Sequence, residues 1–465
     1  MISARPVPSI GRRRTLPFDA MGSCPLASRA MDLSQQFRDH IAKMVKTAAQ
    51  TLSETKYDAL VLGAGSQMVY YADDMEPPFR SNPHFASWAP IKGPHHAIVV
   101  KPGVKPRLIR WAPKDYWYER APFAGDFWTS EFEIDEADSA DGVMARIGAL
   151  GRTVFVGEDE ARGRAAGLSV NPAEVVKRLD WDRAMKTEYE VECLSRASTA
   201  GARGHLAARD AFLAGENELA IHHAFLRGAG ASEDLLPYPT IVCLDEKAAI
   251  LHYHAKRSTG SGRVLLLDAG ASHLGYGCDI TRTSVAPSAD SRFKALAEGL
   301  NALQLRLCSM VKASVSYIEL HLAAHREIGE LLIAHGVLKC SIEEAIVERY
   351  TSVFFPHGVG HHLGIQVHDI GGHQKTREGG ESLPPEAHPY LRNTRMMEVG
   401  HVFTIEPGIY FVQMLLKPHR AGASKAAFGW DVIDALAPFG GIRVEDNVVV
   451  TESGHRNLTR EVLPQ

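Results

Sequence analysis

The chain has 465 residues, of which 45% are hydrophobic, and a formal net charge of -4. This length and composition predict two or three globular domains. The mixed charge contains no basic stripe, which argues against binding to nucleic acid or an anionic membrane, and no apolar run approaches the roughly 18 residues of a membrane span. The six cysteines are scattered without a C-x-x-C pair, as is typical of a reducing compartment, so we expect a cytoplasmic protein.

The first thirty residues differ in composition from the rest of the chain. They contain Arg12–Arg14 and several prolines, but no apolar core of a secretory signal. We therefore predict a disordered extension over residues 1–30.

Residues 31–185 show helix-like and strand-like patterns that alternate. A helical stripe covers 37–55, a second helix is expected near 141–150, and apolar runs predict strands after Tyr57 and at 96–100, 107–111 and 153–156. This alternation predicts a small α/β domain. Gly63 and Gly65 do not open a dinucleotide site, because Met68 stands where a third glycine is required.

The second domain is expected over residues 186–465. Thr187 and Glu190 form a T-x-x-E capping box at the head of a helix, and Ser316 with Glu319 repeats the pattern.

Two carboxylates lie close together in LLLDAGASHLGYGCDITRT. An apolar strand delivers Asp268 into a glycine-rich turn, and Asp279 follows eleven positions later. In an antiparallel hairpin an odd separation allows direct opposition, so we expect both carboxylates on one face of the sheet. Two adjacent carboxylates must share a proton or a cation. Surface-exposed caps are the alternative interpretation.

Further polar residues interrupt apolar strands near the C-terminus. The segment FFPHGVGHHLGIQVHD contains His357, His361, His362 and His368 among glycines that allow tight bends, which favours a site over isolated core histidines. Downstream, VFTIEPGIYF and GGIRVEDNVVV each place one glutamate in an apolar strand. A buried carboxylate requires a charged partner or a metal.

The combined set has four carboxylates and one imidazole: Asp268, Asp279, His361, Glu406 and Glu445. Two divalent cations would neutralise its charge, whereas a mononuclear zinc site uses fewer acids. A two-metal centre can hold a hydroxide and polarise a carbonyl, which is chemistry for hydrolysis. Oxygen-rich ligation suits Mn(II) most, with Co(II) or Zn(II) as alternatives.

Four ordered motifs resemble those of metallopeptidases with the "pita-bread" fold: DAGASHLGYGCDITRT, PHGVGHHLGIQVHD, TIEPGIYF and GGIRVEDN. Within that group the chain is most similar to bacterial Xaa-Pro dipeptidases (prolidases, family M24B), which are also known for organophosphorus acid anhydrolase activity. The similarity runs from about Met31 to the C-terminus. It implies an α/β N-terminal domain followed by an α+β pita-bread catalytic domain.

The resemblance also implies a role for each metal ligand. By this similarity Asp268 binds one ion, Asp279 and Glu445 bridge both ions, and His361 and Glu406 bind the other. His362 departs from the family pattern, because many relatives have proline after the ligand histidine.

Catalytic and substrate-binding roles follow from the same resemblance. His252 and His357 would stabilise the carbonyl or tetrahedral intermediate, and Glu406 would carry a proton to the proline nitrogen. The remaining residues concern the substrate: Tyr238 and His368 would line the pocket, Arg392 would hold the proline carboxylate, and the loop containing Asp74 would cover the pocket of the neighbouring subunit in a homodimer.

Three other functions stay open at this point. Aminopeptidase P shares the ligands but accepts longer peptides, so comparing Ala-Pro with Ala-Pro-Ala separates it from a dipeptidase. A binding module without activity would hold no metal. An enzyme specialised for phosphotriesters would hydrolyse diisopropyl fluorophosphate much faster than dipeptides.

Overall fold

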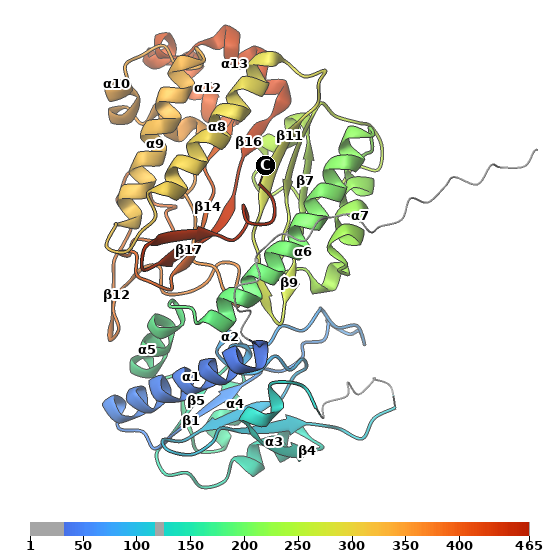
Figure 1. Ribbon diagram of the computed structural model, residues 1–465, viewed down its shortest axis with the longest axis vertical. Helices are drawn as coiled ribbons and strands as arrows, with labels where there is room; N and C mark the ends of the chain where they lie inside the picture. The colour runs from blue at the N-terminus through green and yellow to red at the C-terminus, as the bar shows by residue number, and fades with distance from the viewer. Residues whose placement is uncertain (1–31, 117–124, 465) are drawn as a thin grey trace, which may run out of the picture.

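The computed structural model describes residues 32–116 and 125–464. The predicted extension over residues 1–30 lies outside them. Figure 1 shows a smaller N-terminal domain at one end of an elongated molecule and, at the other, the larger C-terminal domain for which the resemblance implies catalysis. Within the described ranges no helix is both long and apolar enough to cross a membrane.

The N-terminal domain is built on one mixed sheet of six strands, in the order β4-β3-β2-β1-β5-β6. Helix α1 packs beside it (Figure 1) and inserts Phe37, Ile41 and Leu52 into the same apolar core as Leu60 of β1. The predicted helices and strands are confirmed, and the structure adds the helices α2, α4 and α5 and the strands β4 and β6. The elements are α1 (Leu33–Thr55), β1 (Ala59–Gly63), α2 (Pro83–Ala86), β2 (Ala97–Val100), β3 (Arg107–Trp111), η1 (Thr129–Glu131), β4 (Glu133–Ala137), α3 (Ala140–Ile147), β5 (Thr153–Val156), α4 (Glu160–Ala165), β6 (Ser169–Val170) and α5 (Ala173–Arg183).

The first half of the catalytic domain places helices against an antiparallel sheet in the order β11-β8-β7. Figure 1 shows α6 and α7 beside these strands. The predicted capping box is present: Thr187 accepts from the Glu190 amide, and the Glu190 carboxylate accepts from the Thr187 amide. The elements are α6 (Glu188–Leu213), α7 (Glu218–Ala229), η2 (Glu233–Leu235), β7 (Ile241–Leu244), η3 (Asp245–Ala249), β8 (Val264–Asp268), β9 (Ser272–His273), β10 (Tyr276–Gly277) and β11 (Thr281–Val285).

The second half packs α8 and α9 on the opposite side, over a large apolar core (Figure 1). Ser316 caps α9 as predicted, although its hydroxyl accepts from the Ile318 amide. The elements are α8 (Ser291–Ser309), α9 (Tyr317–Ala334), α10 (Ile342–Val347), α11 (Tyr350–Phe354), β12 (Gln374–Thr376), β13 (Gly379–Glu381), β14 (Val402–Ile405), β15 (Gly408–Tyr410), α12 (Gln413–Ala421), η4 (Ala423–Ala427), α13 (Trp430–Leu436), η5 (Ala437–Phe439), β16 (Gly441–Arg443), β17 (Asp446–Thr451) and β18 (Gly454–Asn457).

The β8–β11 hairpin keeps one register through its whole length, and this register corrects the expected opposition of its two acids. Asp268 pairs with Thr281, and the Ala269 amide donates to Ile280 O, so Asp279 lies opposite Gly270. Opposed residues and residues two apart share a face. The acids are therefore diagonal neighbours on one face of the hairpin.

An isolated antiparallel bridge joins the two halves of the catalytic domain. It pairs Thr281 of β11 with Glu445, and the Glu445 amide donates to Thr281 O at 3.0 Å. The Arg282 guanidinium strengthens the seam by donating to Glu445 O at 2.8 Å. The seam brings residues from the second and last quarters of this domain to one place.

A buried ion cluster joins the N-terminal domain to the histidine-rich segment. Arg183 and Lys186 donate to the two carboxylate oxygens of Asp369, at 2.6 Å and 2.8 Å. Both cations hold the pKa of the buried Asp369 carboxyl well below its ordinary value, against the effect of burial. Arg80 adds a second link by donating to Pro237 O, next to Tyr238.

Gly270 tests whether the hairpin depends on close backbone approach. A Cβ at this position would lie 2.0 Å from Cys278 O. Gly270→Ala should therefore lower the free energy of unfolding by at least about 1–3 kcal/mol, as overpacking does, measured by urea unfolding. Ser272→Ala, at an exposed position of β9, is the matched control and should leave stability within about 0.5 kcal/mol. Equal stability of the two variants would contradict this account.

Candidate metal centre

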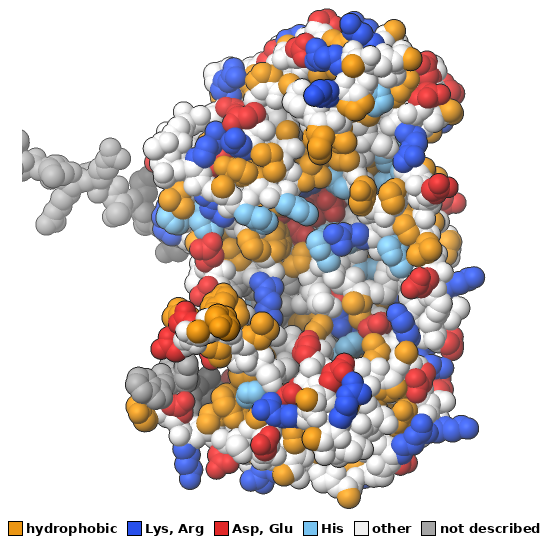
Figure 2. Space-filling model, turned by 180° about the vertical axis from the view of Figure 1, so that it is seen from behind, with side chains coloured by type: hydrophobic (Ala, Val, Ile, Leu, Met, Phe, Trp, Pro, Cys, Tyr) orange, Lys and Arg blue, Asp and Glu red, His pale blue; other side chains and the backbone are white. Residues whose placement is uncertain are grey.

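The five predicted ligands come from four separated segments, and three of them form a compact group. Asp279, His361 and Glu445 are buried and offer ligand atoms that all lie within 4.8 Å of one another. Glu406 Oε1 lies 3.7 Å from His361 Nε2. Figure 2 shows histidine side chains gathered around recessed acidic side chains in the middle of this face.

The backbone carbonyl of the next residue, His362, orients the His361 ring. Its Nδ1 lies 2.9 Å from His362 O, so the ring donates there and leaves Nε2 toward the acids. Nε2 is 3.4 Å from Asp279 Oδ2. Such a carbonyl partner fixes the tautomer of a ligand histidine.

Asp279 is held from two sides. The Tyr238 hydroxyl donates to Asp279 Oδ1 at 2.5 Å, and the Asp279 amide donates to Asn447 Oδ1 at 3.2 Å. The second carboxylate oxygen remains directed at His361. Tyr238, predicted to line the substrate pocket, thus contacts a predicted metal ligand directly.

Asp268 and Glu445 share a polar network. Arg443 donates to Asp268 Oδ2 at 2.5 Å and to the Thr281 hydroxyl at 3.0 Å, and that hydroxyl donates to Glu445 Oε2 at 2.7 Å. Asp268 Oδ1 is buried without a hydrogen-bond partner among the described residues. An unpaired buried carboxylate oxygen is costly unless a cation binds it.

The electrostatics of the cluster reflect burial and repulsion among its acids. Burial raises the pKa of Asp268 to about 6, in spite of the Arg443 guanidinium. Burial also raises the pKa of Glu406 to about 7, with His361 and Arg443 opposing the shift. The pKa of Glu445 is raised well above its ordinary value by burial and by the charges of neighbouring acids.

Asp279 and His361 titrate as an ion pair. Burial alone would raise the pKa of Asp279 and lower that of His361, but their mutual interaction reverses both shifts, with Glu406 also favouring protonated His361. A proton on His361 thus offsets part of the negative charge. The four carboxylates, one imidazole and orphaned Asp268 Oδ1 fit divalent cations that prefer oxygen ligands.

The predicted catalytic histidines lie at the edge of this cluster. His357 is half-buried, with Nδ1 3.8 Å from Glu406 Oε2 and Nε2 3.0 Å from the Tyr410 hydroxyl. Burial lowers the pKa of His357 to about 3, helped by the charges of Arg443 and His252, so the ring is neutral near pH 7. His252 itself is exposed and stacks on His254.

Three residues predicted to bind substrate, His368, Arg392 and Asp74, are exposed, and they differ in their contacts with the acidic cluster. His368 is exposed, and its ring centroid lies 4.3 Å from that of His361. Arg392 is exposed, and its charge contributes to lowering the pKa of His368. Asp74 lies in an exposed loop, and no hydrogen bond or ion pair joins its side chain to another described residue of this chain.

Sequence analysis missed Arg443, Tyr410 and Thr281. The Arg443 guanidinium forms an ion pair with the carboxylate of Asp268, a predicted metal ligand. It also donates to the Tyr410 hydroxyl at 2.9 Å. All three stand inside or beside the four motifs, each within four residues of a predicted ligand. Nearness in the motif was the available signal, but it did not reveal which side chains turn inward.

His362 does not join the cluster. Its ring is buried against His401, with centroids 4.9 Å apart, and only its backbone oxygen serves the site through His361. Cys278 is a buried thiol whose sulfur accepts from the Ala271 amide at 3.2 Å.

The chain belongs to metallopeptidase family M24, whose family profile matches residues 192–452. The fold and the acidic centre are therefore those of a metallopeptidase that uses divalent metal ions. A second profile, described as the N-terminal domain of Xaa-Pro dipeptidase, matches residues 35–181.

Curated relatives resemble the chain over nearly their full length. It is 39% identical to an Xaa-Pro dipeptidase of Serratia proteamaculans over 438 residues, covering 92% of this chain and 99% of the relative. It is 40% identical to an Xaa-Pro dipeptidase of an Enterobacter species over 439 residues, covering 92% and 98%.

Solved structures share the fold at lower identity. Aminopeptidase PepP of Pseudomonas aeruginosa superposes with a TM-score of 0.70 at 22% identity, covering 91% of this chain and 95% of that one. Proline aminopeptidase P II of Yersinia pestis gives a TM-score of 0.68 at 21% identity, covering 92% and 96%. These similarities establish the two-domain pita-bread fold.

The shifted pKa of Glu406 predicts how pH affects stability once metal is removed. The folded chain holds this proton up to about pH 7, whereas the ordinary pKa is 4.5. The stabilisation from the protonated form is fully present below pH 4.5 and is lost as the pH rises through 7. Relative to wild type, Glu406→Gln should gain on the order of 2–3 kcal/mol between pH 4.5 and pH 8.

Urea unfolding of chelator-treated protein at both pH values measures this gain. Glu343→Gln, on an exposed residue of α10, controls for general charge removal and should show the same difference from wild type at both values. A Glu406→Gln effect that did not change with pH would refute the assignment.

Proposed function

We propose that this chain hydrolyses Xaa-Pro dipeptides at a centre of two divalent metal ions formed by Asp268, Asp279, His361, Glu406 and Glu445. The observation that carries the proposal is the convergence of these buried ligands in a chain that is 39% identical to an Xaa-Pro dipeptidase across 99% of that relative. The Xaa-Pro dipeptidase function fits both matched domains.

The division of ligands between the ions is part of the proposal. Asp279 and Glu445 would bridge, because each offers an oxygen to the same point and carries partners that hold the other oxygen in place. Asp268 would serve one ion through its unpaired Oδ1, and His361 with Glu406 the other. Mn(II) suits this oxygen-rich set best, with Co(II) and Zn(II) as alternatives.

The proposed chemistry divides into a metal contribution and a contribution of the protein. Bound divalent ions supply Lewis acidity and an activated water for attack on the peptide carbonyl. Glu406 lies 3.8 Å from His357 and 3.7 Å from His361, and its carboxylate would accept a proton and return it to the proline nitrogen. The neutral His357 ring donates from Nδ1 to Gly358 O, so it would stabilise a developing oxyanion from Nε2 by taking up a second proton as negative charge develops there. His252 would assist from the exposed edge.

Substrate recognition would use groups around the centre. An X-Pro bond has no amide N–H, so binding as an added strand is weak and end groups matter more. Arg392 would hold the proline carboxylate in a bidentate pair. Tyr238 and His368 would line the pocket, next to Asp279 and His361 respectively.

We propose a cytoplasmic homodimer in which the loop around Asp74 limits peptide length in the partner's pocket. The loop is unusually apolar for an exposed segment: Met68, Tyr71 and Met75 are 72%, 101% and 61% exposed in the single chain. Large exposed apolar patches mark interaction surfaces. We further propose domain limits at 31–185 and 186–465, and a side activity on organophosphorus esters and fluorides.

Substrate length and metal dependence test this function. Metal-stripped protein given Mn(II), Co(II) or Zn(II) separately should regain Ala-Pro hydrolysis and cleave Ala-Pro-Ala at least about tenfold more slowly, because only the dipeptide presents its carboxylate next to proline. Release of free proline and alanine is the measurement. Equal turnover of both peptides would favour aminopeptidase P, and no turnover with any metal would favour a binding module.

Arg392 tests the proposed carboxylate subsite. Arg392→Ala should raise KM for Ala-Pro about tenfold or more, the cost of a lost charged hydrogen bond, while sparing hydrolysis of diisopropyl fluorophosphate, which has no carboxylate. Arg326→Ala removes another exposed arginine, on α9, and should change neither substrate. Equal losses on both substrates for Arg392→Ala would contradict the role.

A further inference from the structure

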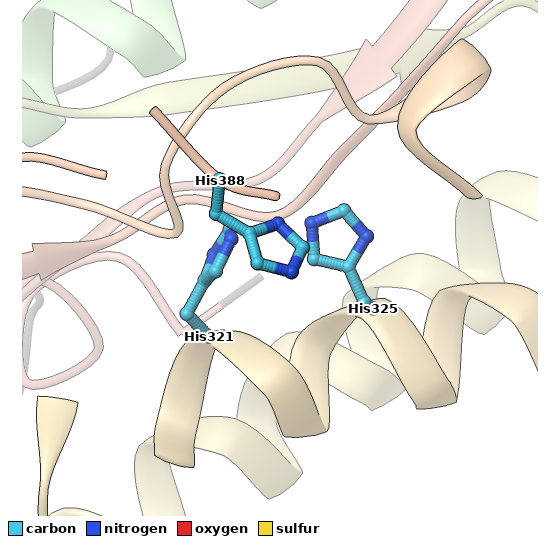
Figure 3. A group of neighbouring side chains, drawn as sticks. All are labelled: His321, His325 and His388. Carbon is cyan, nitrogen blue, oxygen red and sulfur yellow. The ribbon is translucent and has the colours of Figure 1, made fainter. Parts of the chain in front are cut away.

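A second cluster of potential metal ligands lies outside the acidic centre and consists of histidines alone. His321, His325 and His388 each offer one ring nitrogen, and these atoms lie within 4.8 Å of one another. Figure 3 shows the rings converging from two elements: His321 and His325 project from α9, and His388 projects from the loop opposite. The three ring centroids are 4.5–4.6 Å apart.

Both ring nitrogens of His321 lack a hydrogen-bond partner among the described residues. His321 itself is 1% exposed. A buried imidazole that satisfies neither nitrogen loses hydrogen bonds it would make with water. A bound ligand that accepts its lone pair would remove part of that cost.

A hydrogen bond to the Thr351 hydroxyl holds the His325 ring in an orientation that suits metal binding. His325 Nδ1 lies 2.9 Å from the Thr351 hydroxyl, which leaves Nε2 for a ligand. His321 and His325 stand four residues apart on one helix face, a spacing that presents two imidazoles together. A tetrahedral zinc site holds its nitrogens about 3.3 Å apart, so the ring nitrogens, now within 4.8 Å of one another, would move inward by up to about 1.5 Å on binding.

The protonation state also suits a metal. Burial lowers the pKa of His321 to about 2 and that of His325 to about 3, with neighbouring histidines contributing, and it lowers the pKa of His388. All three rings are therefore neutral near pH 7, which is the form that binds metal. The charge of the Arg349 guanidinium contributes to lowering the pKa of His325 and His388, and this guanidinium donates to Ala387 O at 2.7 Å and steadies the loop.

We propose that His321, His325 and His388 form a second metal site, distinct from the acidic centre, that binds Zn(II) through three imidazoles with water in the fourth position. A set without carboxylates favours zinc over Mn(II) or Mg(II), which prefer oxygen. His388 is half-buried, so an ion can enter from solvent.

The ion would join α9 to the segment that carries Arg392. His388 O accepts from the Leu391 amide at 3.1 Å, which closes a turn directly before Arg392. On the other side, Phe355 lies between the triad and His357, with ring centroids 4.9 Å from His325 and 4.8 Å from His357. Zinc binding should therefore order residues 383–392.

Zinc stoichiometry in an Asp279→Asn background tests the site apart from the acidic centre. After chelation, equilibration with Zn(II) and desalting, elemental analysis should find about one zinc per chain in Asp279→Asn and none in Asp279→Asn/His388→Asn. Titration calorimetry should show affinity falling by more than about tenfold. Hydrogen exchange over 383–392 should slow with Zn(II) in the first protein only.

Two further variants complete the design. His321→Asn tests the site from the helix and should have the same effect as His388→Asn, with unchanged circular dichroism. His335→Asn, at the other end of α9 and also half-buried, is the matched control and should keep the zinc. Retention of zinc by both triad variants, or no zinc in Asp279→Asn, overturns the proposal. Two zinc ions in Asp279→Asn would instead refute Asp279 as a bridging ligand.

Discussion

Repulsion among four buried carboxylates is the constraint on which the catalytic domain depends. Asp268, Asp279 and Glu445 are buried and Glu406 is mostly buried, so water screens their charges poorly, and burial raises the pKa of Asp268, Glu406 and Glu445. Arg443 offsets part of this charge from within the cluster. It cannot offset all of it, because one guanidinium carries one positive charge. A site of this kind is built for divalent cations.

The fold withstands this repulsion by fixing each acid through backbone pairing. The hairpin register and the Thr281–Glu445 bridge set the positions of three ligands. The apolar cores on either side lie under α6 and α7 and under α8 and α9. Burial of apolar side chains in these cores offsets the electrostatic free energy of the acidic centre. The candidate ligands therefore hold their positions before a cation binds.

The catalytic domain contains two sets of candidate metal ligands with different chemistry. The acidic centre offers mainly oxygen, whereas the triad on α9 and its facing loop offers nitrogen alone. Metal preference follows donor type, so the two sets would select different ions from the same solution. Phe355, which contacts both His325 and His357, separates them.

The sequence by itself determined the main element types of the N-terminal domain and predicted a set of candidate metal ligands. Apolar periodicity predicted α1, α3, β1, β2, β3 and β5 of the N-terminal domain. The hairpin pattern singled out Asp268 and Asp279, and apolar strands on both sides singled out Glu406 and Glu445, because burial of an acid is readable from its neighbours along the chain. Tertiary structure alone decided that Asp268 opposes Thr281, that Arg443 turns inward, and that His388 meets α9. Those facts depend on register and on contacts between distant segments, and local sequence encodes neither.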